Sequence, residues 1–289
     1  MMTSHDLAVA SLLRGVTAMP LRAGISAAVL AVLVLAAFLA PLTAPHGEAE
    51  ILSHVSFGFP AEAGPLGTDH LGRDLLSRLL YGGRFTLFLA LVTTCLAFLF
   101  GVSAGFTAAL IGGVVDEAVS RIVDGLLSFP SIILALLMIT ALGNSIPILI
   151  VTVALIEACR VYRVARALAL DISVLEFVEA ARARGEGVAW VAAREVLPNT
   201  TGPLSAEFGL RFTYVILFVS ALSFIGIGVQ PPTADWGVMV RENAKGLLYG
   251  SSAALLPAAC IAVVTIAVNL IVDAFTDRDR EARVPEMLP

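Results

Sequence analysis

Residues 171–199 read DISVLEFVEAARARGEGVAWVAAREVLPN and form a polar break between two apolar segments. Ser173 and Glu176 match the Ser-x-x-Glu capping box, in which two side chains bond the free amides of a helix start. Gly185 is the residue type that most readily adopts the left-handed conformation that ends a helix. The pattern therefore predicts a helix over 174–184, about 16 Å long at 1.5 Å per residue.

A second amphipathic run covers 188–197, and we expect it to end at Pro198 because proline interrupts the hydrogen bonding of a helix. Both helices fall short of the roughly 20 apolar residues that span a bilayer. The polar break is therefore predicted to present a surface outside the lipid. In the first helix, apolar residues at helical spacing predict one apolar face, made of Val174, Phe177, Val178 and Ala181.

The composition is that of an integral membrane protein. Hydrophobic residues make up 58% of the 289 residues and charged residues 14%, against about 25% charged in a soluble domain. The apolar runs are continuous rather than alternating, which predicts helices and excludes a β-barrel. The first run exceeds the apolar core of a signal peptide, so we interpret it as a membrane anchor. We expect an all-α integral membrane protein with six transmembrane helices, over residues 22–42, 84–108, 122–142, 146–166, 206–228 and 253–275.

The distribution of Lys and Arg predicts that both termini lie in the cytoplasm. With that orientation, the inside segments carry twelve of these residues and the outside segments five, as the positive-inside rule requires. The chain then divides into a cytoplasmic segment 1–21, a membrane domain 22–275 and a cytoplasmic tail 276–289. Within the membrane domain, the loop 43–83 is expected outside and the loop 171–199 in the cytoplasm.

Most of the expected spans contain no ionisable residue near their middle, which argues against an ion-coupled transporter acting alone. Glu157 is the deepest charge, and Arg160, Arg163 and Arg166 follow it at one-turn spacing toward the inner end of the fourth span. Two interpretations stay open: an interfacial anchor with an internal ion pair at i+3, or a gate or partner contact. Arg211 is expected at a helix entrance.

The sequence lacks the marks of an ATPase or an enzyme. It contains no Gly-Lys pair and therefore no P-loop, so the chain does not hydrolyse ATP itself. The histidines lie outside the expected spans, and His46, His54 and His70 show no metal-binding spacing. No nucleophile and base emerge as a pair. We therefore expect neither an enzyme nor a directly bound cofactor.

Small residues mark the places where helices are expected to touch. Gly101-Val-Ser-Ala-Gly105 in the second span is a GxxxG pattern, which allows two helix backbones to approach closely. The cysteines fall inside expected spans and are interpreted as packing residues rather than disulfide partners; they are Cys95, Cys159 and Cys260.

The polar break also carries a recognisable motif. Glu179-Ala180-Ala181, three residues, Gly185 and then Leu197-Pro198-Asn199 resemble the EAA loop of permease subunits of binding-protein-dependent ABC importers. The resemblance implies the type I importer permease fold, and it implies that the loop is a coupling helix that docks on a separate ATPase subunit. The residues that it assigns to this contact are Glu176, Glu179, Ala180, Ala181, Arg182, Gly185, Leu197 and Pro198. Glu195 departs from the family, in which a basic residue or His is common.

Two more segments are similar to the C-type permease of the dipeptide, oligopeptide and nickel importers. They are Leu66 to Arg78, LGTDHLGRDLLSR, and Leu222 to Pro232, which Asp235-Trp236-Gly237 follows. The residues of interest in the first segment are Gly67, Thr68, Asp69, Gly72, Arg73, Asp74, Ser77 and Arg78. We expect an amphipathic helix at the outer interface, either structural or a docking or gating element beneath a binding protein. Trp236 is expected to be a partner contact or an interfacial anchor.

The resemblance implies a set of partners and a location. The partners are a paralogous B-type permease subunit, one or two cytoplasmic ATPase subunits that use the ATP, an extracytoplasmic solute-binding protein and membrane lipid, with no nucleic acid. The location is the bacterial inner membrane. The implied cargo is a di- or oligopeptide or a peptide-like compound. Open alternatives are a nickel, metallophore or opine importer of the same family, a stand-alone secondary transporter, and an assembly factor of a membrane complex.

Overall fold

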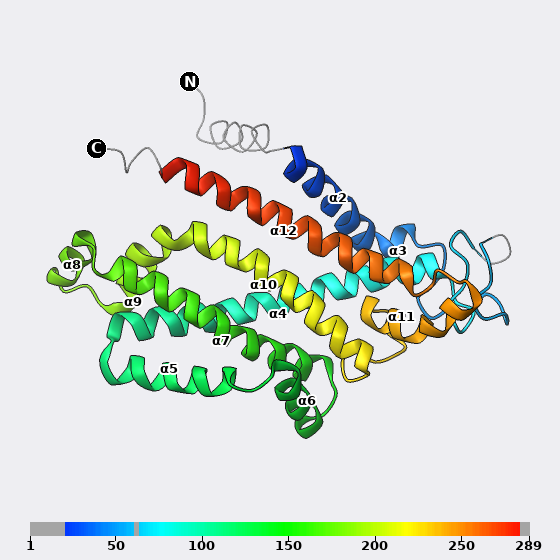
Figure 1. Cartoon of the computed structure of the whole chain (residues 1–289), viewed down its shortest axis with the longest axis horizontal. Helices are drawn as coiled ribbons and strands as arrows, with labels where there is room; N and C mark the ends of the chain where they lie inside the picture. The colour runs from blue at the N-terminus through cyan, green and yellow to red at the C-terminus, as the bar shows by residue number, and fades with distance from the viewer. Residues whose placement is uncertain (1–20, 61–63, 284–289) are drawn as a thin grey trace.

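A computed structural model describes residues 21–60 and 64–283, and every regular element within them is a helix (Figure 1). The helices are α2 (Leu21–Phe38), α3 (Ala40–Thr43), α4 (Leu75–Ile111), α5 (Gly113–Leu127), α6 (Ser131–Leu142), α7 (Ile146–Ser173), α8 (Glu176–Ala183), α9 (Val188–Val191), the π-helical η1 (Ala192–Val196), α10 (Leu197–Ile225), α11 (Trp236–Asn243), the 3-10 helix η2 (Ala244–Tyr249) and α12 (Leu255–Arg283). Of the expected terminal segments 1–21 and 276–289, residues 1–20 and 284–289 lie outside the described residues.

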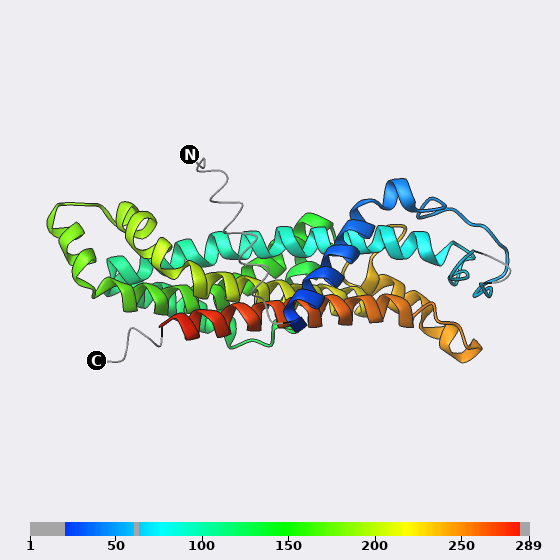
Figure 2. The same cartoon turned by 90° about the horizontal axis from the view of Figure 1, so that it is seen from above.

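The long helices run roughly along one axis, so the molecule is elongated (Figures 1 and 2). α8 and α9 lie at one end, which we call the α8 end. α11, residues 44–60 and residues 64–74 lie at the other, which we call the α11 end. α4 extends along most of this length, and α2 crosses obliquely and packs on α4 and α12.

The all-α membrane architecture is confirmed, whereas the expected count of six spans is only partly supported. Four stretches of the described residues are long and apolar enough to cross a membrane: α2, α4, the run Val188–Ile225 and Leu255–Thr276 in α12. The bent pair α5 and α6 makes a fifth when the two are counted together. α7 is also long, with 28 residues, but three charges interrupt its apolar part, at Glu157, Arg160 and Arg163.

The prediction of one continuous helix over 122–142 is wrong. α5 ends at Leu127, α6 begins at Ser131, and their axes differ by 91°. Pro130 explains the break, because it has no backbone N–H to donate and it forces the preceding residue toward an extended conformation. The third expected span is therefore a corner rather than a rod.

Close contact between α4 and α7 confirms the interpretation of the GxxxG pattern. A Cβ atom added at Gly101 would lie 2.6 Å from Cβ of Val161 and 2.8 Å from the carbonyl oxygen of Ala158. One added at Gly105 would lie 2.8 Å from the carbonyl oxygen of Tyr162. Because glycine has no side chain, the two backbones can pack at a separation that any other residue would prevent.

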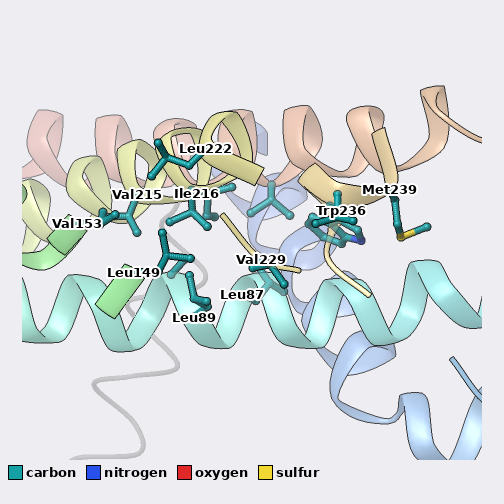
Figure 3. Close-up of a cluster of buried hydrophobic side chains, with 14 of the residues drawn as sticks. Leu87, Leu89, Leu149, Val153, Val215, Ile216, Leu222, Val229, Trp236 and Met239 are labelled. Carbon is teal, nitrogen blue, oxygen red and sulfur yellow. The ribbon is translucent and has the colours of Figure 1, made fainter. Parts of the chain in front are cut away.

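The main apolar core lies where α4, α7, α10 and the α11 segment meet. Figure 3 shows Leu87 and Leu89 of α4 close to Leu149 of α7 and Ile216 of α10, with Trp236 and Met239 of α11 closing the cluster. All of these side chains are buried. The core therefore ties α11 to the long helices.

The α4–α7 contact yields a stability test. Gly101→Ala should lower thermal stability, because overpacking costs about 1–3 kcal/mol and outweighs the roughly 1 kcal/mol by which alanine favours a helix. Gly125→Ala, in α5, is the matched control, because its added Cβ meets nothing within 4 Å. Thermal unfolding of the detergent-solubilised chain measures both. Equal melting temperatures for the two variants would contradict the contact.

Candidate functional site

The short helix α8 is held to the bundle by one side and exposed on the other. Val178 and Ala181 are fully buried and belong to the same buried apolar cluster as Phe106 of α4 and Ala165 of α7. The predicted apolar face is therefore half correct. Val174 and Phe177 are exposed instead, because Val174 precedes the helix and the turn there points it away from the bundle.

Gly185 ends this helix as predicted. Its φ is +86°, its backbone N–H donates to the carbonyl of Arg182 at 2.9 Å, and the N–H of Glu186 donates to the carbonyl of Ala181 at 3.2 Å. These two bonds are the Schellman arrangement, in which a left-handed residue turns the chain back on the last helical carbonyls. The angle between α8 and the following segment is thus fixed by a residue without a Cβ.

The predicted capping box at Ser173 is wrong. α7 continues through Ser173, whose hydroxyl donates to the carbonyl of Leu170 at 2.9 Å. α8 begins at Glu176 with Leu175 as its N-cap, and no side chain caps it. The helix is therefore shorter than predicted, and α7 is seven residues longer than the expected fourth span.

The free side of α8 carries charges that form no ion pair with other described residues. Glu176, Glu179, Ala180 and Arg182 are exposed, and none of the ion pairs among the described residues involves them. Of the residues assigned to the coupling contact, Gly185, Leu197 and Pro198 are exposed as well, whereas Ala181 is buried. Acidic residues begin the helix and Arg182 lies in its last turn, the order that suits the helix dipole.

The prediction that the second helix ends at Pro198 is wrong. α9 passes through the π-helical turn η1 directly into α10, so helix runs without a break from Val188 to Ile225. Pro198 directly follows the π-helical turn, which already interrupts the regular i to i−4 hydrogen bonding, so its missing N–H does not end the helix. Asn199 donates from its side-chain amide to the carbonyl of Glu195 at 2.6 Å, and so bonds one carbonyl of the turn.

At the opposite end, the expected amphipathic helix is replaced by a buried turn. Residues 64–74 fold back on the loop, and α4 starts at Leu75 with Asp74 as its N-cap. A Cβ at Gly72 would lie 1.9 Å from the carbonyl oxygen of Ser53, so only glycine fits there. The eight residues of interest in this segment are all buried: Gly67, Thr68, Asp69, Gly72, Arg73, Asp74, Ser77 and Arg78. Their burial supports a structural role rather than a docking surface of their own.

Four charged side chains form a buried network at this α11 end. Asp69 Oδ2 lies 2.7 Å from Nε of Arg73 and 3.2 Å from Nε of Arg78. Glu242 Oε2, from α11, lies 3.3 Å from Arg73 Nη2 and 3.2 Å from Arg78 Nη2. Asp69 and Arg78 are fully buried. The network joins the loop to α4 and α11. The sequence did not predict the pairing of Glu242 with Arg73 and Arg78.

Trp236 is neither an interfacial anchor nor a surface contact. It is buried, and its indole Nε1 donates to the carbonyl of Leu79 at 3.0 Å. The preceding Asp235 is the N-cap of α11 and accepts from Val238 N at 3.1 Å and from Thr86 Oγ1 at 2.7 Å. Burial raises the pKa of the Asp235 carboxyl, although these hydrogen bonds act in the opposite direction.

A second charge cluster lies between α7 and α10. Glu157 is buried and contacts Arg160, as the i+3 spacing predicted, and its other oxygen lies 3.2 Å from Nη1 of Arg211. Arg211 Nε also lies 2.7 Å from Oε1 of Glu207. The placement of Arg211 at a helix entrance is wrong, because α10 begins fourteen residues earlier, at Leu197.

Comparisons with known proteins agree with the geometry. Residues 73–279 match the family model described as "Binding-protein-dependent transport system inner membrane component". The dipeptide transport system permease protein of Alkalihalophilus pseudofirmus is 31% identical over 244 residues, 84% of this chain and 80% of the relative. A putative peptide transport system permease protein of Brucella suis is 35% identical over 249 residues, 86% and 83% of the two chains. The nickel transport system permease protein of Escherichia coli is 34% identical over 212 residues, 73% and 76%.

The buried network at the α11 end predicts an unequal response to two similar substitutions. Glu242→Gln leaves two guanidinium groups short of a counter-charge and should cost about 3–5 kcal/mol. Glu117→Gln breaks an exposed pair with Arg121 and should cost less than about 1 kcal/mol. Thermal unfolding followed by tryptophan fluorescence compares them. A tolerated Glu242→Gln would show that the network does not stabilise this end.

The raised pKa of Asp235 predicts a pH dependence with a definite sign. The folded chain holds this proton more tightly than the unfolded chain, so stability falls as pH rises from the unfolded pKa, about 3.9, through the folded pKa. Asp235→Asn keeps a cap but cannot ionise. The stability of the wild type relative to this variant should therefore decline with pH and then level off. A constant difference between pH 4 and pH 8 would contradict the shift.

Proposed function

Because this chain belongs to the family of binding-protein-dependent transport system inner membrane components, we propose that it is the C-type permease subunit of an ABC importer that carries a peptide or peptide-like solute. The chain is a membrane permease component and not an enzyme. The observation that carries the proposal is α8, which is anchored by Val178 and Ala181 and exposes charged residues that form no ion pair within the described part of the chain.

We assign the α8 end to the cytoplasm and the α11 end to the outside, with both termini in the cytoplasm. The excess of Lys and Arg in the segments on the α8 side supports this orientation. Six spans result when α7 and the bent pair α5 and α6 each count as one. α7 packs along α4, whose length exceeds the hydrocarbon core of about 30 Å.

In this assignment, α8 is the coupling helix, and a separate ATPase subunit docks on it. Glu179, Ala180 and Gly185 form the centre of the contact, because the small Ala180 lets the partner approach and Gly185 fixes the direction of the chain. α7 leads into α8, and α9 leads without a break into α10. Movement of the docked ATPase would therefore displace two membrane helices together.

The remaining partners follow from the two ends and the exposed sides of the bundle. A solute-binding protein would dock on the surface that the buried network supports, formed by residues 44–60, 64–74 and 230–250. A paralogous B-type permease would cover part of the apolar surface that α5, α6 and α10 expose. Two of the three relatives described above are named for peptide transport and one for nickel transport, which favours a peptide cargo over a metal.

The test of this function uses two exposed glycines of the turn between α8 and α9 that differ in backbone conformation. Both Gly185 and Gly187 are exposed, and a Cβ at either would meet nothing within 4 Å. Gly185 has φ +86° and Gly187 has φ −77°. Gly185→Val should reduce ATP-driven uptake at least about tenfold, because a β-branched residue in the left-handed region costs about 1–3 kcal/mol, whereas Gly187→Val should retain it.

The assay uses the complete complex in proteoliposomes, with the ATPases and the binding protein, and follows a radiolabelled dipeptide. Normal uptake by Gly185→Val would refute the role of the α8 cap. ATP-driven uptake of Ni²⁺ without uptake of any peptide would show that the cargo is a metal rather than a peptide. Unchanged co-purification of the ATPases with both variants would locate the defect in coupling rather than in assembly.

A further inference from the structure

The cluster of Glu157, Arg160, Glu207 and Arg211 lies deep in the bundle. Arg211 is fourteen residues from the end of α10 at Ile225, or about 21 Å at 1.5 Å per residue, and 23 residues from the start of the continuous helix at Val188. Glu157 is eleven residues, or about 17 Å, from the start of α7 at the α11 end. In a hydrocarbon layer about 30 Å thick, both positions are inside the layer rather than at its outer surface.

The two signs of charge in this cluster are not equally exposed. The side chains of Glu157 and Glu207 are 1% and 10% exposed, whereas those of Arg160 and Arg211 are 34% and 15% exposed. Glu157 is therefore on the inner side and Arg160 on the outer side, whereas Glu207 and Arg211 differ little in exposure. Arg211 also stacks on the ring of Tyr214, 4.9 Å from its centroid, and Tyr214 is half exposed. The cluster is neutral in sum but presents a cationic surface.

Such a surface at this depth is unsuited to lipid. An exposed guanidinium in hydrocarbon costs several kcal/mol, so charged groups in spans face a bundle interior or a water-filled cavity. Arg160 cannot reach an interface easily, because it is held by Glu157 and by the Ser131 hydroxyl, 2.7 Å from its Nη2, at the corner between α5 and α6. The face formed by α7 and α10 therefore borders water or another polar surface in the assembled protein.

Resting on the proposed function, we propose that Arg160 and Arg211 form a cationic contact in the translocation path for a solute that carries a free carboxylate. A guanidinium group binds a carboxylate through two parallel hydrogen bonds. The buried Glu157 and Glu207 orient the two arginines and compete for the same donors. That competition weakens the hold on the solute and favours its passage over its retention.

Cysteine labelling tests the contact without depending on ATP or on knowledge of the solute. In a chain without Cys95, Cys159 and Cys260, within the assembled complex in vesicles, Tyr214→Cys should react with water-soluble methanethiosulfonates. The anionic reagent should react faster than the cationic one. Ile266→Cys, an exposed residue of α12 expected to face lipid, should react with neither.

Charge removal should change the ratio of the two rates. Arg160→Gln should lower the anionic-to-cationic ratio at Tyr214→Cys about tenfold at intermediate dielectric, because Arg160 shares Glu157 with the Arg211 that stacks on Tyr214. Arg163→Gln, one turn away on α7 and paired with Asp124, is the matched control and should leave the ratio unchanged. Arg160→Lys keeps the charge and should keep the ratio, which separates an electrostatic effect from misfolding.

A dipeptide with a free C-terminal carboxylate should slow the labelling, and its C-terminal amide should not. Labelling of Tyr214→Cys as slow as that of Ile266→Cys, equal protection by acid and amide, or a ratio that Arg160→Gln leaves unchanged would each overturn the contact. If the wild-type complex shows no ATP-driven peptide uptake but the labelling pattern is as expected, the proposed function is refuted. The water-accessible cationic contact at Arg160 and Arg211 is then still supported.

Discussion

The close approach of α4 and α7 at Gly101 and Gly105 supports everything else in this molecule. α4 contributes Arg78 of its first turn to the buried ion network, and Phe106 near its far end to the buried cluster that includes Val178 of α8. α7 leads directly into α8. Because glycine lets these two backbones touch, they form one rigid unit that links the two ends of the bundle. A wider separation of α4 and α7 would remove the rigid connection between the α8 end and the α11 end.

Charged groups are buried at two places, and each is paired across elements far apart in the sequence. At the α11 end, Glu242 closes the network begun by Asp69, and the outcome is a rigid cap. Between α7 and α10, the pairs leave guanidinium groups partly exposed. The first network fastens one segment to another, whereas the second joins two helices that flank α8 and α9 and would be displaced together. The two clusters differ in burial: the network at the α11 end is buried, whereas the arginines of the cluster between α7 and α10 are partly exposed.

Local signals in the sequence were reliable where a single residue governs the backbone. Gly185 ends α8 with a left-handed turn, and Gly101 marks a helix contact. Glu157 pairs with Arg160 one turn away. The membrane class and the motif of the polar break were also evident from composition and spacing. In each case the interaction involves neighbours in the chain, or it depends on a property, such as the absence of a Cβ, that does not change with context.

The predictions that failed depended on competition between local and distant partners. Ser173 could cap a helix, but α7 packs on α4 and stays helical through that position. Pro198 could end a helix, but the π-helical turn before it lets α9 run on into α10. By itself, the sequence determined the membrane class, the polar break and its glycine turn. Tertiary packing alone decided which charges meet, such as Arg211 with Glu157, because those partners are brought together only when separate helices bury a common surface.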